Sequence, residues 1–313
     1  DFPPYETALA STMVDVVRNN HVDLLHVHYA IPHASAAYMA KQILAQEGRD
    51  IPFITTLHGT DITLVGNHPY YKPAVSFSIN HSDCVTSVSQ SLKDDTYRLF
   101  DIDKEIVVIP NFIENNKELL KKDEPCHRSL MANEDEKIIT HISNFRKVKR
   151  IDDVVKIFYE IQKEVPSKLM MVGEGPEKEA AENLCAQLKI HDKVIFFGNS
   201  NEIDKILCFS DLFLLPSETE SFGLAALEAM SCGVPVISSN SGGLPEVNQN
   251  GVTGYLSNVG DIEDMSKNAI SILKDEATLS QFKVNASEVA KTFDIQNILP
   301  LYEDLYFKEL QNK

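Results

Sequence analysis

The sequence predicts an α/β protein composed of two doubly wound, Rossmann-like domains. The prediction rests on two series of strands that alternate with helices, one within residues 23–111 and one within residues 137–256. Strands separated by helices form parallel sheets with helices on both faces. A polar, charge-rich segment, residues 116–136, lies between the two series and is the expected linker. At 313 residues, the chain is long enough for two domains of ordinary size.

Short apolar runs define the expected strands, and the segments between them define the helices. In the N-terminal domain, residues 1–115, strands are expected at 23–28, 52–58, 83–89 and 105–111, with helices at 33–46, at 70–79 and up to residue 100. In the second domain, residues 137–295, strands are expected at 137–143, 168–173, 193–198, 211–216, 234–239 and 254–256, with a helix at 151–165. The tail from 262 to 310 is expected to be helical, with residues 296–313 as its last helix.

The first residues do not match the usual start of such a domain. A doubly wound domain begins with a strand and a glycine-rich, phosphate-binding turn. Residues 1–19 instead lead into an amphipathic helix. We therefore expect the chain to lack the first strand and loop of its N-terminal domain.

Composition and charge argue against several classes of protein. A net charge of −17 and a pI of about 5.0 disfavour binding to nucleic acid or to anionic membranes. The five cysteines are scattered without close spacing, which fits a reducing cytoplasm better than a disulfide framework. No apolar run reaches membrane-spanning length. The oligomeric state is not encoded in these features, and a homo-oligomer is left open.

The most informative segment is residues 214–235. Within it, SFGLAALEAMSC predicts a short helix with Ser221 as N-cap and Gly233 just past its end. Because nearly every residue from 224 to 232 is apolar, we expect this helix to be buried on all sides. Glu228 is the exception, and an unpaired buried carboxylate costs on the order of several kcal/mol unless something binds it.

The start of this helix is suited to an anion. The N–H groups of a first turn have no acceptor within the helix, and here they belong to Phe222, Gly223 and Leu224. Gly223 allows a ligand to approach closely. Glu220 lies just before the turn, so phosphate donors and two carboxylates occur at one helix end. This combination predicts a sugar-nucleotide site; the alternative is an ordinary buried helix in which Glu228 meets a structural arginine.

The motif ESFGLAALEAMSCGVPVI, followed by SGGLPEV and NGVTGYL, resembles the signature of the retaining, glycogen-synthase-like glycosyltransferases of family 4. Two glutamates separated by seven residues characterise that family, and Glu220 and Glu228 have this spacing. The resemblance implies the GT-B fold, in which two Rossmann-like domains face a cleft and the last helix, here residues 296–313, crosses back to the first domain. It also implies a UDP-sugar donor and no required cofactor.

The resemblance further implies roles in donor binding. Glu228 would bind the ribose hydroxyls, Glu220 would hold sugar hydroxyls, and the turn at 222–224 would bind the diphosphate. The leaving group also requires cations.

The basic segment FRKVKR, residues 145–150, is the expected source of those cations. Lys149 matches the family's lysine. The arginine match is less clear, because the spacing points to Asn144, and we assign the role to Arg146. A solvated basic turn is the alternative.

Polar residues follow the strands of the first domain at the edge where parallel sheets bind ligands. These residues are His28, Tyr29, His58, Gly59, Thr60, Asp61, Ser89 and Asn111. The resemblance implies that His58 contacts the donor sugar near its anomeric carbon, whereas without it a core histidine is equally plausible. Thr60 and Asp61 are expected to position the sugar or the acceptor, although Asp61 would serve equally well as a helix or turn cap. Asn111 is a further candidate contact.

Two further strings, HYAIPHA and TTLHGTDIT, narrow the resemblance to family members that transfer N-acetylglucosamine to L-malate in bacillithiol synthesis. Tyr29 is then a candidate acceptor contact, with a buried structural tyrosine as the alternative. A dianionic acceptor requires cations, and Lys41, Lys72 and Lys93 are available in this domain. The sequence does not choose among them.

Two weaker features remain. His26, His28 and His33 are close enough to suggest a metal, but no acidic or thiol ligand lies near in sequence, and we expect none. The loop 173–176 (GEGP) and Asn199 follow strands, and the resemblance places such loops near the nucleotide base. A simple tight turn explains the first equally well.

Together these features predict a cytoplasmic retaining glycosyltransferase that transfers N-acetylglucosamine from UDP-N-acetylglucosamine to L-malate. By resemblance, the departing phosphate acts as the base and no enzymic nucleophile is needed. The alternatives are the same chemistry on another sugar, an inositol phosphate or a lipid-linked glycan, a UDP-N-acetylglucosamine epimerase, or a sugar-nucleotide-binding module without catalysis. We expect no nucleic-acid partner and no stable membrane association.

Overall fold

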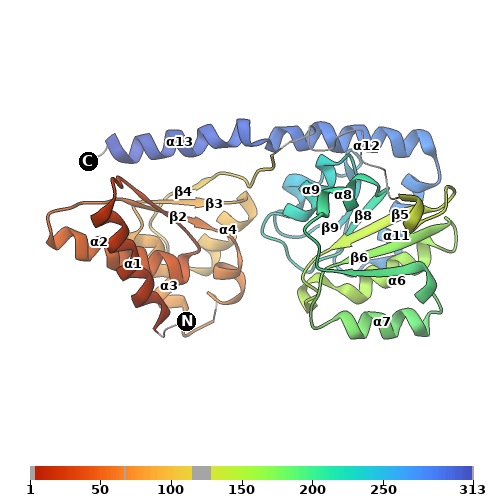
Figure 1. Ribbon diagram of the computed structural model, residues 1–313, viewed down its shortest axis with the longest axis horizontal. Helices are drawn as coiled ribbons and strands as arrows, with labels where there is room; N and C mark the ends of the chain where they lie inside the picture. The colour runs from red at the N-terminus through yellow and green to blue at the C-terminus, as the bar shows by residue number, and fades with distance from the viewer. Residues whose placement is uncertain (1–3, 67, 115–127, 312–313) are drawn as a thin grey trace. The chain divides into compact units, whose positions relative to one another are not determined.

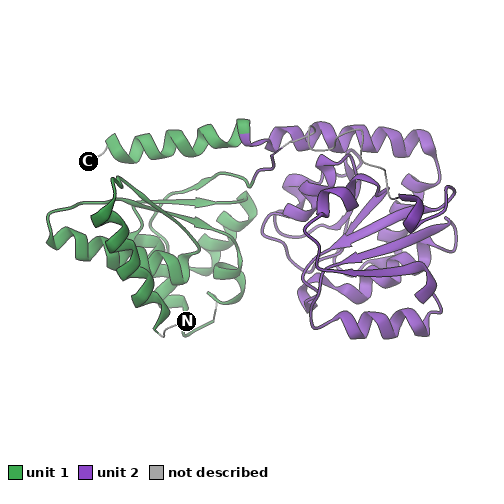
Figure 2. Cartoon of the chain, in the orientation of Figure 1, with its two compact units in different colours: residues 1–111, 296–313 green, residues 112–295 purple. Residues whose placement is uncertain are grey.

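The computed structural model describes residues 4–66, 68–114 and 128–311. The chain divides into two compact units: residues 1–111 with 296–313, and residues 112–295 (Figure 2). Each unit contains one parallel β-sheet covered by helices. Within the described residues, no helix is both long and apolar enough to cross a membrane.

The first unit contains a four-stranded parallel sheet in the order β1-β2-β3-β4. The strands are β1 Leu25–His28, β2 Phe53–Leu57, β3 Cys84–Ser87 and β4 Ile106–Val108. The helices of residues 1–111 are α1 Tyr5–Asn19, α2 Ser35–Gln46, α3 Lys72–His81 and α4 Gln90–Leu99, with one-turn segments η1 Ala30–Ala34 and η2 Thr60–Leu64. Because the strands are parallel, their carboxyl ends lie at the same edge of the sheet, where η1 follows β1 and η2 follows β2.

Helix α13, Ile295–Gln311, completes the core of the first unit (Figures 1 and 2). Its residues Ile298, Tyr302 and Leu305 pack against Ile54 of β2 and against neighbouring strands. Helices α1 and α2 pack on each other, and their apolar residues form separate clusters with β1 and β2. Two helical layers therefore enclose this sheet, as a doubly wound architecture requires.

The second unit contains a six-stranded parallel sheet in the order β10-β9-β8-β5-β6-β7. The strands are β5 Lys137–Ile142, β6 Ser167–Val172, β7 Val194–Gly198, β8 Leu212–Leu215, β9 Val236–Ser239 and β10 Gly254–Ser257. The helices are α5 Arg128–Met131, α6 Ile151–Ile161, α7 Lys178–Gln187, α8 Ile203–Cys208, α9 Leu224–Ser231, α10 Leu244–Val247, α11 Ile262–Leu273 and α12 Glu276–Ala290, with η3 Lys147–Lys149, η4 His191–Lys193 and η5 Lys291–Phe293.

Helices cover both faces of this second sheet. Figure 1 shows α6 and α7 on one side and α8 and α9 on the other. A cluster of buried residues joins α6, α11 and α12 to the strands, with Phe158 and Ile139 among its fully buried members. Strand β5 lies at the centre, because the chain runs outward through β6 and β7 and then returns to β8 on the opposite side.

The predicted fold class is confirmed, including the two parallel sheets, and most strands are one to three residues shorter than expected. The expected linker, residues 116–136, stays a prediction. Residues 116–127 lie outside the described part of the chain, whereas 128–136 belong to the second unit. They do so because the Arg128 side chain binds backbone carbonyls at Phe209 and Glu136.

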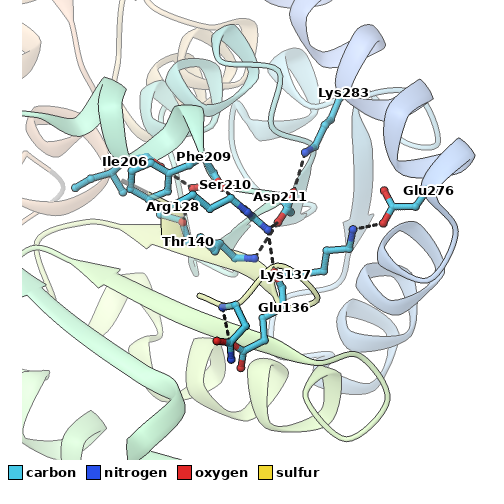
Figure 3. Close-up of polar contacts among 12 residues, drawn as sticks. Arg128, Glu136, Lys137, Thr140, Ile206, Phe209, Ser210, Asp211, Glu276 and Lys283 are labelled. Carbon is cyan, nitrogen blue, oxygen red and sulfur yellow. Dashed lines mark hydrogen bonds and ion pairs between the residues drawn. The ribbon is translucent and has the colours of Figure 1, made fainter. Parts of the chain in front are cut away.

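A polar network anchored on Asp211 ties the amino ends of the central strands together (Figure 3). Its carboxylate, 8% exposed, pairs with Arg128 at 2.9 Å and with Lys283 of α12 at 2.8 Å. It also accepts the Ile138 N–H at 2.9 Å. The surrounding cations lower the pKa of Asp211 against the opposing effect of burial, so the carboxylate stays ionised. This edge is opposite the carboxyl ends of the strands, and the network therefore stabilises the fold.

Removing the Asp211 carboxylate tests how much this network contributes to the stability of the fold. We expect Asp211→Ala to lower the free energy of unfolding by about 3 kcal/mol or more, because two cations and a strand N–H lose their partner. Urea denaturation followed by circular dichroism measures the effect. The matched control is Glu160→Ala, which removes an exposed pair with Lys163 and should cost about 0.5 kcal/mol or less. Equal losses in both variants would contradict a structural role for the network.

Candidate functional site

The second unit contains a pocket of about 570 Å³, within the range of roughly 300–1,000 Å³ usual for small-ligand sites. It lies at the carboxyl ends of β5, β6 and β7 and beside the start of α9. The lining residues are Ile142, Ser143, Asn144, Lys149, Val172, Gly173, Glu174, Asn199, Ser200, Ile203, Leu224, Ala225 and Glu228. Because the chain order reverses between β5 and β8, the pocket occupies the switch point where doubly wound sheets bind ligands.

Helix α9 supplies one wall of this pocket. The sequence predicted a helix buried on all sides, and that prediction is wrong: Leu224 is 42% exposed, and Ala225 and Glu228 are half-buried. These three residues share one helical face and line the pocket. Ala226, Leu227, Ala229 and Met230 face the core and are fully buried. The apolar run therefore faces the pocket on one side and the core on the other, and hydrophobicity alone does not distinguish these two environments.

Glu228 is the unpaired charge in this wall. Among the described residues, no hydrogen bond or ion pair reaches its carboxylate, which excludes a described arginine as the structural partner considered above. Burial raises the pKa of Glu228, and the nearby Asp204 adds to this effect. A half-buried carboxylate that faces a ligand-sized pocket without a partner is poised to accept hydrogen bonds from a ligand.

The start of α9 differs from the sequence prediction. The N-cap is Gly223, with φ 97°, and not Ser221. The positive φ favours glycine, and a Cβ there would lie 2.6 Å from Leu244 Cδ2, so the end of the Leu244 side chain would have to shift. Phe222 precedes the helix, is 2% exposed and packs edge-on against Phe293. Leu224, the first helical residue, lines the pocket.

Lys149 and Glu220, separated by 71 residues in sequence, form one unit. Lys149 Nζ lies 2.5 Å from Glu220 Oε1, and both side chains are largely buried. The Ser217 hydroxyl donates to the same oxygen at 2.8 Å. Lys149 lines the pocket, and the pair fixes Glu220 beside it. The structure thus brings together two of the predicted site residues from different loops.

Arg146 was the less secure of the two expected cations. It is exposed and does not line the pocket, whereas Asn144, the position favoured by spacing, does. The reason is the conformation of the turn: Phe145 points into the core and is fully buried, which directs its two neighbours to different surroundings.

Weaker sequence candidates fall in the pocket. Gly173, Glu174 and Asn199, from loops after β6 and β7, all line it. Ser200, in the same loop as Asn199, lines it too, whereas sequence reasoning missed Ile203, which carries no motif of its own.

Sequence reasoning also missed a buried histidine, His141, which holds a residue of the pocket wall in place. His141 of β5 hydrogen-bonds the Leu214 carbonyl and the Ser143 hydroxyl, each at 2.8 Å. Burial lowers the pKa of His141 from 6.5 to about 4, so the ring stays neutral. The ring therefore fixes Ser143 at the pocket without adding charge.

In the first unit, polar groups gather where β1 and β2 end. His28 Nδ1 lies 2.8 Å from His58 Nε2, and the rings are 5.0 Å apart. The ring of Tyr29 also contacts His58, with 5.0 Å between the ring centroids and a tilted arrangement. Burial, with His28 as a second cause, lowers the pKa of His58 from 6.5 to about 4. The two rings thus share a hydrogen bond as neutral groups, and Tyr29, 37% exposed, is not the buried tyrosine of the alternative interpretation.

Asp61 fits the turn-cap alternative rather than a direct substrate contact. It is 2% exposed, and its oxygens accept N–H groups from Ala30 at 2.8 Å, Gly59 at 2.9 Å and His58 at 3.3 Å. It therefore fixes the loops after β1 and β2 to each other. Thr60 is exposed beside it and free to meet a ligand, while Asn111 is half-buried after β4.

The histidines of β1 show no arrangement for a metal ion. His26 uses both ring nitrogens, bonding the hydroxyls of Tyr306 and Thr56 at 2.7 Å each. His33 bonds the His28 carbonyl at 2.6 Å. The described residues hold no group of three or more His, Cys, Asp or Glu side chains suited to a metal.

The structure distinguishes the three candidate lysines. Lys41 pairs with Asp83 at 2.7 Å, and Asp83 precedes β3 at the amino edge of the sheet. Lys72 lies over the ring of Phe100, 5.7 Å from its centroid, just before β4. Lys93 lies in the first turn of α4, which follows β3 directly, at the same edge as His58, whereas Lys72 begins α3 after the longer connection from β2.

Comparison with known proteins identifies the class. The sequence profile "Glycosyl transferases group 1" matches residues 123–289, and "Glycosyltransferase Family 4" matches residues 1–117. Two solved structures share the fold across the whole chain or nearly so. Sucrose-phosphate synthase from Thermosynechococcus elongatus has a TM-score of 0.81 at 21% identity, covering 100% of this chain and 81% of that one. HepE from Anabaena, in complex with UDP, has a TM-score of 0.79 at 21% identity, covering 96% and 82%.

The chain belongs to the family 4 glycosyltransferases of the GT-B fold, as the sequence predicted. Among curated relatives, it is 45% identical over 312 residues to N-acetyl-alpha-D-glucosaminyl L-malate synthase of Bacillus anthracis, covering 99% of this chain and 81% of the relative. It is also 25% identical over 304 residues to 2-deoxystreptamine N-acetyl-D-glucosaminyltransferase of Niallia circulans, covering 92% and 77%.

The loop that carries Glu220 should depend on Gly242. A Cβ at Gly242 would lie 1.9 Å from the Glu220 carbonyl oxygen, so Gly242→Ala must displace this loop. The matched control is Gly251→Ala, since Gly251 also has positive φ but no atom within 4 Å of an added Cβ. We expect Gly242→Ala to lower the free energy of unfolding by about 2 kcal/mol more than the control, measured by urea denaturation. Indistinguishable losses would show that backbone conformation alone requires glycine.

Proposed function

We propose that this chain transfers N-acetylglucosamine from UDP-N-acetylglucosamine to the hydroxyl of L-malate, with retention at the anomeric carbon. The observation that carries the proposal is the unpaired Glu228 carboxylate in a ligand-sized pocket at the start of α9. The 45% identity to an enzyme of that name supports the same acceptor. The likeness extends over 99% of this chain. It therefore includes both the pocket of the second unit and the edge of the first sheet that carries His28 and His58.

The donor would bind in the second unit. Glu228 would accept hydrogen bonds from the ribose hydroxyls, and the backbone at Gly223 and Leu224 would face the diphosphate. Lys149 would neutralise charge on the leaving group while remaining close to Glu220. Glu174 and Asn199 line the pocket at the ends of β6 and β7, where the base would lie.

The reaction exchanges one bond for another. The bond from the anomeric carbon to the β-phosphate oxygen breaks, and the malate hydroxyl oxygen bonds to the same face of that carbon. The hydroxyl proton passes to the departing phosphate oxygen, so no carboxylate nucleophile is needed. A retaining hydrolase instead requires two carboxylates about 5 Å apart around the scissile bond. Here Glu220 is held by Lys149 and is suited to binding sugar hydroxyls.

The acceptor would bind at the carboxyl edge of the first sheet. Lys93 is a cation at that edge, and the exposed Tyr29 and Thr60 supply hydroxyl groups. Two malate carboxylates require positive charge and hydrogen-bond donors, and this set provides both. We further propose that the reaction takes place in the cytoplasm and needs no bound cofactor.

The donor assignment predicts a specific loss. Glu228→Gln keeps the shape of the side chain but removes its charge, and we expect it to weaken UDP binding by about 10- to 100-fold. Isothermal titration calorimetry with UDP measures this. The matched control is Glu179→Gln on the exposed face of α7, which should bind UDP normally. Undiminished affinity in the Glu228 variant would refute the ribose contact.

The acceptor assignment is tested by following UDP release from UDP-N-acetylglucosamine with and without L-malate. We expect release to depend on malate, and Lys93→Ala to raise the KM for malate by about tenfold or more with a smaller change in kcat. Lys41→Ala, on the opposite edge, is the control and should leave that KM unchanged. Release with another acceptor only, or epimer formation without malate, would overturn the assignment. UDP binding without UDP release from the donor and without epimer formation would indicate a binding module.

A further inference from the structure

Two cysteines that are far apart in sequence meet at the ends of the helices beside the pocket. Cys208 is the last residue of α8, and Cys232 is the C-cap of α9. Their sulfur atoms lie 3.3 Å apart. The pair is not evident in the sequence, because the two cysteines are 24 positions apart. A disulfide joins sulfurs about 2.05 Å apart, so closure requires an approach of roughly 1.2 Å.

The surroundings of the pair differ from those of the other described cysteines. Cys84 and Cys185 are buried, and burial raises the pKa of each thiol to about 11. Cys208 is exposed, and hydrogen bonding to Cys232 lowers the pKa of its thiol. Cys232 is half-buried, its sulfur lies 3.8 Å from the Asp204 carbonyl oxygen, and its pKa is raised. An accessible thiol with a lowered pKa, lying beside a second thiol, is the arrangement of reactive cysteine pairs.

We infer that Cys208 and Cys232 are a redox modification site, which a low-molecular-weight disulfide converts reversibly into an intramolecular disulfide. The Cys208 thiolate attacks one sulfur of the small disulfide and expels one thiolate, leaving a mixed disulfide. Cys232 then loses its proton to solvent and attacks the Cys208 sulfur. This step forms the intramolecular disulfide and expels the second thiolate of the small disulfide. The protein loses two hydrogen atoms, and one small disulfide is reduced to two thiols, so atoms and electrons balance.

The bond would close a covalent loop around the donor segment. Residues 209–231 lie within the loop, and they include β8, Glu220, Gly223 and Glu228. The two helices joined at their ends also line the pocket, through Ile203 of α8 and through Leu224 and Glu228 of α9. Binding groups must be held to within about 0.5 Å of their productive positions, and the required approach of the sulfurs exceeds this. Oxidation should therefore weaken donor binding, a consequence that rests on the proposed function.

The chemistry is tested with oxidised glutathione on the native chain. After blocking of free thiols, cleavage after glutamate separates the two cysteines, because Glu218, Glu220 and Glu228 lie between them; trypsin would leave both in one peptide. We expect mass spectrometry to find the 208–232 cross-link, and dithiothreitol to reverse it. Cys126→Ser is the matched control and should retain the cross-link. Absence of the cross-link in the wild type would overturn the inference.

The order of attack is tested by two single variants. Cys232→Ser should accumulate glutathione on Cys208, because no second thiol resolves the mixed disulfide. Cys208→Ser should be modified at Cys232 more slowly, by about tenfold or more, since that thiol is less exposed and less ionised. Equal rates at the two positions would overturn the assignment of Cys208 as the attacking thiol.

Calorimetry with UDP tests the link to the donor site. We expect the oxidised wild type to bind UDP more weakly than the reduced wild type, by about threefold or more, and oxidised glutathione to leave the affinity of Cys208→Ser unchanged. Unaltered affinity in the cross-linked chain would overturn this link. Failure of the reduced wild type to bind UDP would count instead against the proposed function.

Discussion

Close contact between backbones at the carboxyl edge of the second sheet is the constraint on which the pocket depends. A Cβ at Gly173 would lie 1.9 Å from the Ser143 carbonyl oxygen, and one at Gly175 would lie 2.6 Å from that of Phe145. The Gly243 N–H donates to the Glu220 carbonyl at 2.8 Å, and Gly242 allows the same approach. Side chains would separate these loops. The glycines therefore fix the positions of Lys149 and Glu220, which otherwise belong to independent surface loops.

Much of this architecture could be predicted from the sequence because parallel strands buried on both faces form continuous apolar runs. DLFLLP and VPVISS were recognised for that reason, and they became β8 and β9. The start of α9 was placed two residues early, because a serine is a common N-cap, whereas here Gly223 turns the chain and packs under Leu244. Hydrophobicity also overstated the burial of α9, since a ligand pocket and a core both favour apolar residues.

Contacts between distant loops were beyond prediction from one sequence. The Lys149–Glu220 pair, the His28–His58 hydrogen bond and the Cys208–Cys232 pair join residues 71, 30 and 24 positions apart. Periodicity and motifs describe only neighbouring residues, while these pairs are set by strand order and loop packing. Asp61 illustrates the consequence. Its motif suggested either a ligand contact or a cap, and only its three backbone partners favour the cap.

The two glutamates of the family motif occupy different electrostatic environments, and this difference suits different tasks. Glu220 is neutralised by Lys149 and further fixed by Ser217, so its geometry is set before any ligand arrives. Glu228 has no described partner and a raised pKa, so its desolvation is offset only when a ligand donates hydrogen bonds to it. A diphosphate near Lys149 would compete with Glu220 for the ammonium group. Glu220 would then gain capacity to bind sugar hydroxyls at the stage when the donor is present, which couples its availability to donor binding.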